Sequence, residues 1–170
     1  MNTRALITAL LLAAVLVGGV VLLARTQQTA MENALPPRHE FATLVAASDA
    51  ALAYRRAHGG TYTPIAGTGS MAPYIPAGQA KTLAAQATEI VAFVVTAAGK
   101  TFADVAEGSL VIYRPEWNER RPVMHQAAQF DGGGWIMTGL HNAHSESMER
   151  MTADKFTGLV AAAFVVKGSP

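Results

Sequence analysis

The chain has 170 residues, enough for one domain with a hydrophobic core once an apolar N-terminal segment is set aside. Its 13 Lys and Arg residues are balanced by 12 Asp and Glu residues, so we expect no basic surface for a nucleic-acid partner. The absence of cysteine excludes disulfides, a thiolate nucleophile and cysteine-ligated metal sites. Any nucleophilic side chain must therefore react through oxygen or nitrogen.

The N-terminal segment is apolar. Residues 5–24 (ALITALLLAAVLVGGVVLLA) contain no charge and are flanked by Arg4 and Arg25. As a helix rising about 1.5 Å per residue, this run would cover roughly 30 Å, the thickness of a bilayer core. We therefore expect residues 1–25 to form a single transmembrane anchor. Arg4 favours a cytoplasmic N-terminus, with the remainder of the chain exported. A signal peptide cleaved near residues 28–30 (QTA) is the alternative.

A linker and a helix are predicted next. Residues 26–39 contain the Pro36-Pro37 pair and predict a linker. From residue 40 the chain reads EFATLVAASDAALAYRRAH, with alanines and leucines at helical spacing, and this helix should end at Gly59-Gly60. Residues 40–170 are expected to form one domain.

Beyond Gly60 the pattern favours β-strands. Short runs rich in Val, Ile, Tyr, Phe and Thr alternate with glycine, proline or charged clusters, which is typical of a mainly β domain. The run of Gly132, Gly133 and Gly134 predicts a hairpin loop between two of these strands. The expected strands lie in TYTPIAGTG, TEIVAFVV, GSLVIYR, RPVMHQAAQ, GWIMTG and FTGLVAAAFVV.

A serine follows the first of these strands, in residues 67–73 (GTGSMAP). Glycine before Ser70 allows the backbone to turn sharply, and the following Met-x-Pro resists helix formation. The hydroxyl group of Ser70 can therefore sit exposed on a rigid bend, which suits a nucleophile. Most Gly-Ser turns are only turns, so this segment alone does not establish a function.

Five segments together resemble the conserved boxes of type I signal peptidases. GTGSMAP resembles the S-G-S-M-x-P box, and residues 102–113 (FADVAEGSLVIY) resemble the G-D-x-V-x-F strand entry. Residues 122–125 (PVMH) resemble the segment that carries the general base, which is lysine in bacterial enzymes and histidine in endoplasmic-reticulum and archaeal enzymes. Residues 135–142 resemble the T-x-G-D-N-N element, and residues 150–160 resemble the closing strand. The resemblance covers roughly residues 60–166 in the family's order.

This resemblance implies a mainly β fold of coiled antiparallel sheets, with an N-terminal transmembrane helix, a short helix before the catalytic strand and a site at one edge of the sheet. It also implies a serine endopeptidase that needs no cofactor or metal and that cleaves signal peptides or similar segments of exported proteins. Its partners would be a preprotein or peptide substrate and membrane lipid. The catalytic domain would lie on the extracytoplasmic side of the cell membrane.

The same resemblance assigns catalytic roles. Ser70 would be the nucleophile and His125 the general base, since imidazole, with a reference pKa near 6.5, can accept a proton around neutral pH. The Thr68 hydroxyl and the Ser70 backbone N–H would bind the oxyanion. Met71 and Pro73 would contact an extended substrate.

The group that orients the histidine is less well defined. The resemblance points to Glu146, yet residues 140–143 (LHNA) depart from the relatives' Gly-Asp-Asn-Asn. Asp131 or Glu149 could replace Glu146, or the third member could be absent. Candidates for contact with the membrane interface, or for a plain core role, are residues 74–76, Trp117 and Trp135.

Two other functions stay open. His141, His144 and Glu146, joined by His125 or Asp131, form an alternative metal site, although their spacing lacks the helical H-E-x-x-H arrangement. The second alternative is a non-catalytic exported module that keeps the peptidase fold for binding or assembly. The altered G-D-N-N element and residues 77–101, which match none of the boxes, motivate it.

Overall fold

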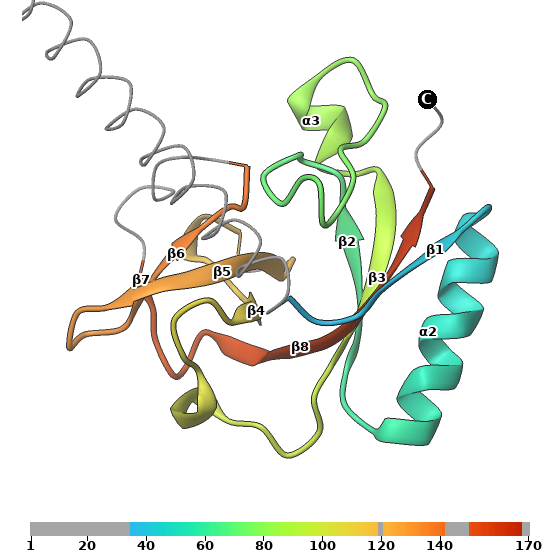
Figure 1. Cartoon of the computed structure of the whole chain (residues 1–170). Coiled ribbons are helices and arrows are strands. Elements are labelled where there is room, and N and C mark those ends of the chain that lie inside the picture. Colours follow the sequence, from blue (N-terminus) through green and yellow to red (C-terminus); the bar gives the residue numbers. More distant parts are fainter. Residues whose placement is uncertain (1–34, 119–120, 142–149, 168–170) are drawn as a thin grey trace, which may run out of the picture. The chain divides into compact units, whose positions relative to one another are not determined.

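The computed structural model describes residues 35–118, 121–141 and 150–167. From Pro36 onward these residues form one mainly β unit whose eight strands make a curled sheet (Figure 1). The sheet order is β2-β3-β8-β4-β5-β6-β7, every pair along this path is antiparallel, and β1 pairs with β8 outside the path. The mainly β, antiparallel fold predicted from the sequence is thus confirmed.

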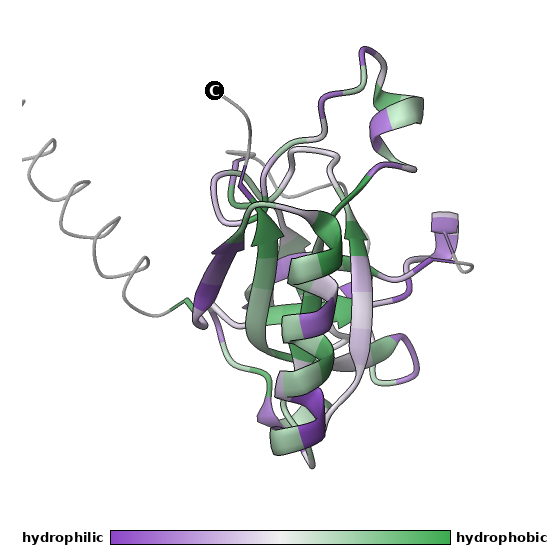
Figure 2. Cartoon of the chain, turned by 90° about the vertical axis from the view of Figure 1, so that its right-hand side faces the viewer, coloured by the Kyte–Doolittle hydropathy of each residue, from purple (hydrophilic) through white to green (hydrophobic). Residues whose placement is uncertain are grey.

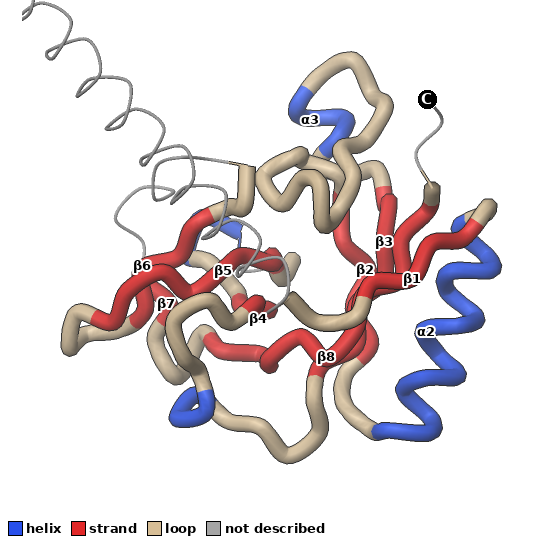
Figure 3. Tube along the Cα trace, viewed as in Figure 1, coloured by secondary structure: helices blue, strands red, loops and turns tan. Residues whose placement is uncertain are grey.

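Helices are few beside the strands (Figure 3). The strands are β1 (Arg38–Phe41), β2 (Tyr62–Ala66), β3 (Ile90–Thr96), β4 (Leu110–Tyr113), β5 (Val123–Phe130), β6 (Trp135–Thr138), β7 (Arg150–Met151) and β8 (Phe156–Val166). The helices are α2 (Leu44–His58), α3 (Leu83–Gln86) and the 3-10 turns η1 (Phe102–Asp104) and η2 (Glu116–Asn118).

The six strands expected from the sequence are all present. The predicted glycine hairpin is also confirmed, since it joins β5 to β6 and Asp131 N–H donates to the Gly134 carbonyl at 3.1 Å. Gly132 adopts a φ of 87°, a left-handed conformation that favours glycine. The turn therefore has the glycine that its backbone requires.

Strand β1 corrects the predicted boundary between linker and helix. Its residues, expected to belong to the linker and the first helical turn, pair in parallel with β8 from Arg38 opposite Ala163 to Phe41 opposite Val166. Helix α2 begins only at Leu44, because Thr43 is extended and its side chain accepts a hydrogen bond from Ala46 N–H at 3.2 Å. Its C-terminal end at Gly59 is as predicted.

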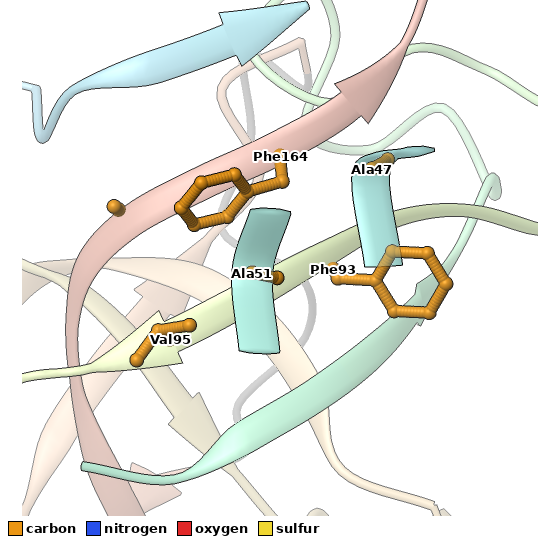
Figure 4. Close-up of a cluster of buried hydrophobic side chains, with 6 residues drawn as sticks. Ala47, Ala51, Phe93, Val95 and Phe164 are labelled. Atoms are coloured by element: carbon orange, nitrogen blue, oxygen red, sulfur yellow. The ribbon is translucent and has the colours of Figure 1, made fainter. Parts of the chain in front are cut away.

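Helix α2 packs on one part of the sheet, over β3 and β8 (Figure 4). Ala47 and Ala51 are fully buried, and their small side chains let the helix approach the aromatic rings of Phe93 and Phe164. The strands behind the helix are largely hydrophobic, whereas β1 is hydrophilic (Figure 2). This burial holds β2, β3 and β8 in a fixed arrangement.

A second cluster of buried side chains lies in the other part of the sheet, formed by β4 to β7. Strand β8 connects the two parts, because Leu159 pairs with Val111 of β4 while Val160 pairs with Thr96 of β3. The buried members of the second cluster are Val105, Val111, Tyr113, Ala127, Met137 and Met151.

Within residues 35–118, 121–141 and 150–167, no helix combines the length and hydrophobicity needed to cross a membrane. The predicted anchor at residues 1–25 and most of the predicted linker lie outside the described residues. The anchor therefore stays a prediction.

Candidate active site

Residues 67–78, which we call the serine loop, leave the end of β2 and return to their starting point. Gly78 N–H donates to the Gly67 carbonyl at 2.7 Å, and Gly67 N–H donates to the Glu89 carbonyl at 3.0 Å. A Cβ atom on Gly67 would lie 2.3 Å from the Gly78 nitrogen, so glycine is required for this close approach. The loop is therefore closed at its base by backbone contacts.

Ser70 lies on the tight bend that its sequence predicts. Gly69 has a φ of 83°, and its carbonyl accepts a hydrogen bond from Ala72 N–H at 3.1 Å. A second segment packs against the serine from another side, where His141 N–H donates to the Ser70 carbonyl at 3.0 Å. A Cβ atom on Gly139 would lie 2.4 Å from that same carbonyl oxygen. The backbone of Ser70 is thus fixed on two sides.

His125 belongs to β5, which we call the histidine strand. It lies opposite Val111 of β4 and is only 4% exposed. Because β5 pairs with both β4 and β6, His125 sits in an interior strand of the sheet. Ser70, in contrast, follows β2, the terminal strand of the sheet path.

The structure brings Ser70 and His125 together. The Ser70 Oγ atom lies 3.3 Å from His125 Nε2, although 55 positions separate the two residues in the chain. In a flat sheet, β2 and β5 would be four strand spacings apart, roughly 19 Å at about 4.8 Å per spacing. The contact therefore depends on the curl of the sheet and on the reach of the serine loop.

Potential oxyanion donors surround the serine hydroxyl. The Thr68 Oγ1 atom lies 3.3 Å from Ser70 Oγ, on an exposed part of the loop. The backbone N–H of Ser70 has no acceptor within the part of the chain that the structure describes. Both groups that the sequence nominated as oxyanion donors are thus close to the hydroxyl, and the N–H is available to an incoming oxygen.

Tyr113 contacts the other nitrogen of the histidine ring. Its hydroxyl oxygen lies 3.0 Å from His125 Nδ1, and the two ring centroids are 5.9 Å apart. Sequence reasoning missed this residue, because its proximity to His125 depends on the pairing of β4 with β5. In that register Tyr113 lies opposite Val123, so it is the diagonal neighbour of His125 on the same face.

The acidic candidates for orienting the histidine divide into two groups. Glu146 and Glu149 lie outside the described residues. Asp131 lies in the hairpin beyond β5 and is ion-paired with Arg150, whose hydrogen bond is the main reason that the pKa of Asp131 is lowered. Six residues of extended chain, roughly 20 Å, separate Asp131 from His125, which excludes direct contact.

The alternative metal site is only partly visible. His141 is described, whereas His144 and Glu146 are not. Among the residues with described positions, no three His, Asp or Glu side chains gather in a way that could hold a metal ion.

An open groove of about 1080 Å³ contains the Ser70 and His125 side chains. Met71, nominated for substrate contact, is buried and lines the groove, whereas Pro73 is exposed and does not. Leu83 and Trp117 also line it and are 75% and 66% exposed. The rest of the lining comes mainly from the serine loop, β2 (Pro64, Ile65, Ala66), the chain before β5 (Asn118, Arg121, Pro122) and β5 itself (Val123, Met124).

Tyr74 joins the serine loop to the beginning of the described chain. Its hydroxyl donates to the Pro36 carbonyl at 3.2 Å, and the Arg38 guanidinium donates to the Tyr74 carbonyl at 2.8 Å. Burial raises the pKa of Tyr74 above its usual range, and the positive charge of Arg38 offsets only part of this increase. With 5% and 3% exposure, Tyr74 and Ile75 have a core role, so Trp117 is the more accessible of the nominated interfacial aromatics.

Comparisons with protein-family models, with curated proteins and with solved structures found no match to the chain. The family resemblance therefore rests on the sequence segments described above. The chemistry of the site rests on the geometry around Ser70 and His125.

Proposed function

We propose that the chain is a serine endopeptidase of the type I signal-peptidase kind. The observation that carries this proposal is the 3.3 Å separation of Ser70 Oγ and His125 Nε2 in an open groove. A serine hydroxyl is a weak nucleophile until a base takes its proton, and an imidazole nitrogen at this distance can do so. The five sequence segments in the family's order add support.

The reaction proceeds in two halves. Ser70 Oγ attacks the scissile carbonyl carbon while its proton passes to His125 Nε2, and that proton then goes to the leaving amine as the peptide C–N bond breaks. A water molecule enters next and gives its proton to Nε2 as it attacks the acyl carbon. The ester bond to Ser70 breaks, the proton returns to Oγ, and the new carboxyl terminus departs.

The developing oxyanion needs hydrogen-bond donors. The Ser70 backbone N–H and the Thr68 hydroxyl fill this role, because both are next to the nucleophile. In the free enzyme the Thr68 hydroxyl lies within hydrogen-bond distance of Ser70 Oγ. It can turn toward substrate oxygen when the tetrahedral intermediate forms.

The substrate is an extended segment of an exported preprotein. β2 is the terminal strand of the sheet path, and Pro64, Ile65 and Ala66 line the groove beside Ser70. An extended peptide can follow this edge and present its carbonyl to the hydroxyl. The apolar run at residues 5–24 would hold the enzyme at the bilayer from which such substrates emerge.

A fluorophosphonate probe tests the nucleophile and needs no peptide substrate. Ser70 Oγ forms a bond to phosphorus and fluoride leaves, so an activated serine becomes labelled. The full-length chain in detergent micelles should be labelled at Ser70, and labelling should disappear in Ser70→Ala and fall sharply in His125→Ala. Ser48→Ala and His58→Ala, both on α2, are the matched controls and should label like the parent chain.

Cleavage of a preprotein reconstituted with the enzyme in lipid vesicles tests the reaction itself. Removal of either Ser70 or His125 should lower turnover by a factor on the order of 10⁴–10⁶. A folded parent chain that binds preprotein but neither cleaves it nor takes up the probe would contradict the proposal. That result would favour the non-catalytic binding module.

A further inference from the structure

Both nitrogens of the His125 ring have partners in the structure. Nε2 lies 3.3 Å from Ser70 Oγ, and Nδ1 lies 3.0 Å from the hydroxyl oxygen of Tyr113. Tyr113 and His125 are 2% and 4% exposed, so bulk water does not compete freely for this contact. The three side chains form a continuous line from phenol to imidazole to serine.

The sheet holds Tyr113 firmly in this position. Antiparallel pairing of β4 with β5 places Val111 opposite His125 and Tyr113 opposite Val123. The Tyr113 ring is part of the buried cluster that includes Ala127 and Met137, so it cannot swing away without opening that core. The phenol oxygen is therefore a fixed feature of the histidine's surroundings.

The position of the hydrogen on the imidazole ring decides what this contact does. A neutral imidazole carries one N–H, and it can accept the Ser70 proton at Nε2 only if that hydrogen is on Nδ1. The tautomer is set by the hydrogen bond that the other nitrogen makes. An acceptor at Nδ1 favours the reactive tautomer, whereas a donor at Nδ1 would favour the inactive one.

We propose that Tyr113 is a positioning residue whose phenolic oxygen accepts a hydrogen bond from His125 Nδ1–H, which leaves Nε2 free to receive the Ser70 proton. This inference rests on the proposed function, because the tautomer matters only if His125 acts as a base. A hydroxyl group can accept at its oxygen while donating its own hydrogen to another acceptor, so the role is compatible with its chemistry. Tyr113 thus does part of the work that an acidic residue does in the Ser-His-Asp arrangement.

The tautomer can be read directly by ¹⁵N nuclear magnetic resonance. The full-length chain, labelled with ¹⁵N-histidine and held in detergent micelles near pH 8.5, gives separate signals for a protonated and an unprotonated ring nitrogen. His125→Gln identifies the His125 signals by their loss. The parent chain should show hydrogen on Nδ1, and hydrogen on Nε2 would overturn the inference without any variant.

Tyr113→Phe keeps the ring in the core and removes the oxygen. We expect the Nδ1–H population to fall in favour of Nε2–H and fluorophosphonate labelling to slow by about tenfold, the factor for loss of one ordinary hydrogen bond. Tyr62→Phe, which removes a hydroxyl that is hydrogen-bonded to Ser48, is the matched control. It should change neither the His125 tautomer nor the labelling rate. Unchanged His125 signals in a folded Tyr113→Phe chain would overturn the inference.

The tautomer measurement does not require catalysis, so the two proposals fail separately. A parent chain with Nδ1–H that shifts in Tyr113→Phe, but that never labels at Ser70, contradicts the peptidase and keeps the assignment of the hydrogen bond. A parent chain that labels and cleaves, yet keeps Nδ1–H in Tyr113→Phe, supports the peptidase and removes Tyr113 from its mechanism.

Discussion

The serine loop and the histidine strand are held in place by different means. In the loop, backbone hydrogen bonds and close glycine contacts fix residues 67–78, while the Thr68 side chain is exposed. In the strand, His125 is fixed by pairing with Val111 of β4 and by buried neighbours such as Tyr113, within a strand that β4 and β6 flank. Changes near the loop should therefore affect turnover more than folding, whereas changes near the strand should affect both.

The largest effect is expected from the strand side. Ile112 of β4 is fully buried opposite Met124 of β5, and Ile112→Ala should lower the free energy of unfolding by about 2–5 kcal/mol through lost burial and a cavity. Urea denaturation measures this change. Leu83→Ala, at a residue 75% exposed, is the control and should be nearly neutral. Comparable losses for the two variants would contradict the assignment of Ile112 to the core.

Thr68→Val tests the loop side. The replacement keeps a β-branched side chain at an exposed position but removes the donor 3.3 Å from Ser70 Oγ. Turnover should fall by about 10²–10³-fold, while the unfolding curve should be unchanged. Steady-state cleavage of a preprotein peptide gives the rate. Full turnover in folded Thr68→Val would contradict the proposed role of this hydroxyl as an oxyanion donor.

Gly139→Ala should displace Ser70 while leaving its hydroxyl group chemically unchanged. The new Cβ atom would lie 2.4 Å from the Ser70 carbonyl oxygen, so one of the two segments must shift. Since a displacement of about 1 Å can lower the rate of a positioned reaction about 10²-fold, probe labelling should slow by up to that factor. Gly133→Ala, where the Cβ has ordinary room, is the control in the β5–β6 hairpin. Equal labelling rates would show that the loop tolerates the displacement.

Tyr74→Phe removes the hydrogen bond from the serine loop to Pro36, which should cost about 0.5–1.5 kcal/mol of stability near neutral pH. Burial raises the pKa of Tyr74 in the folded chain, so its stabilising contribution is complete below the unfolded value of about 10 and declines as pH rises above it. Phenylalanine cannot ionise. Urea denaturation at pH 7 and pH 10.5 should therefore show a smaller alkaline loss for Tyr74→Phe than for the parent or for Tyr62→Phe.

The smallest effect concerns the turn that leads toward β4. The backbone N–H of Thr101 and the ammonium group of Lys100 lower the pKa of Asp104 to about 2. This contribution is present above the unfolded value of about 3.9 and is lost as pH falls toward 2. Asp104→Asn should slightly flatten the decline of the melting temperature between pH 4 and 2. Asp49→Asn on α2 is the control, and an identical decline in both variants would contradict this role.

The regular part of the fold could be predicted from local pattern. The β-branched runs indicated six strands, and Gly59 indicated the end of α2, because these signals depend on adjacent residues. Strand β1 could not be predicted, since Arg38, His39 and Glu40 have no hydrophobic alternation and become a strand only through pairing with β8. The two-residue strand β7 is too short to carry a pattern.

The site could be predicted only in part. The family resemblance paired Ser70 with His125. No local sequence pattern, however, predicts that the curl of the sheet brings the end of β2 close to β5. Tyr113 could not be found for a similar reason. Residues 114–122 connect β4 to β5, and this connection is too long for turn type to fix the register that makes Tyr113 the neighbour of His125.

Strand β8 has a consequence for how the domain folds. It pairs with β1, β3 and β4, yet it follows all the other described strands in the chain. On a ribosome, β8 emerges after β2, which leads into the serine loop, and after β5, which carries His125. The part of the sheet before the serine loop and the part that carries His125 can therefore be joined only after β8 has emerged, so Ser70 and His125 should meet late in folding.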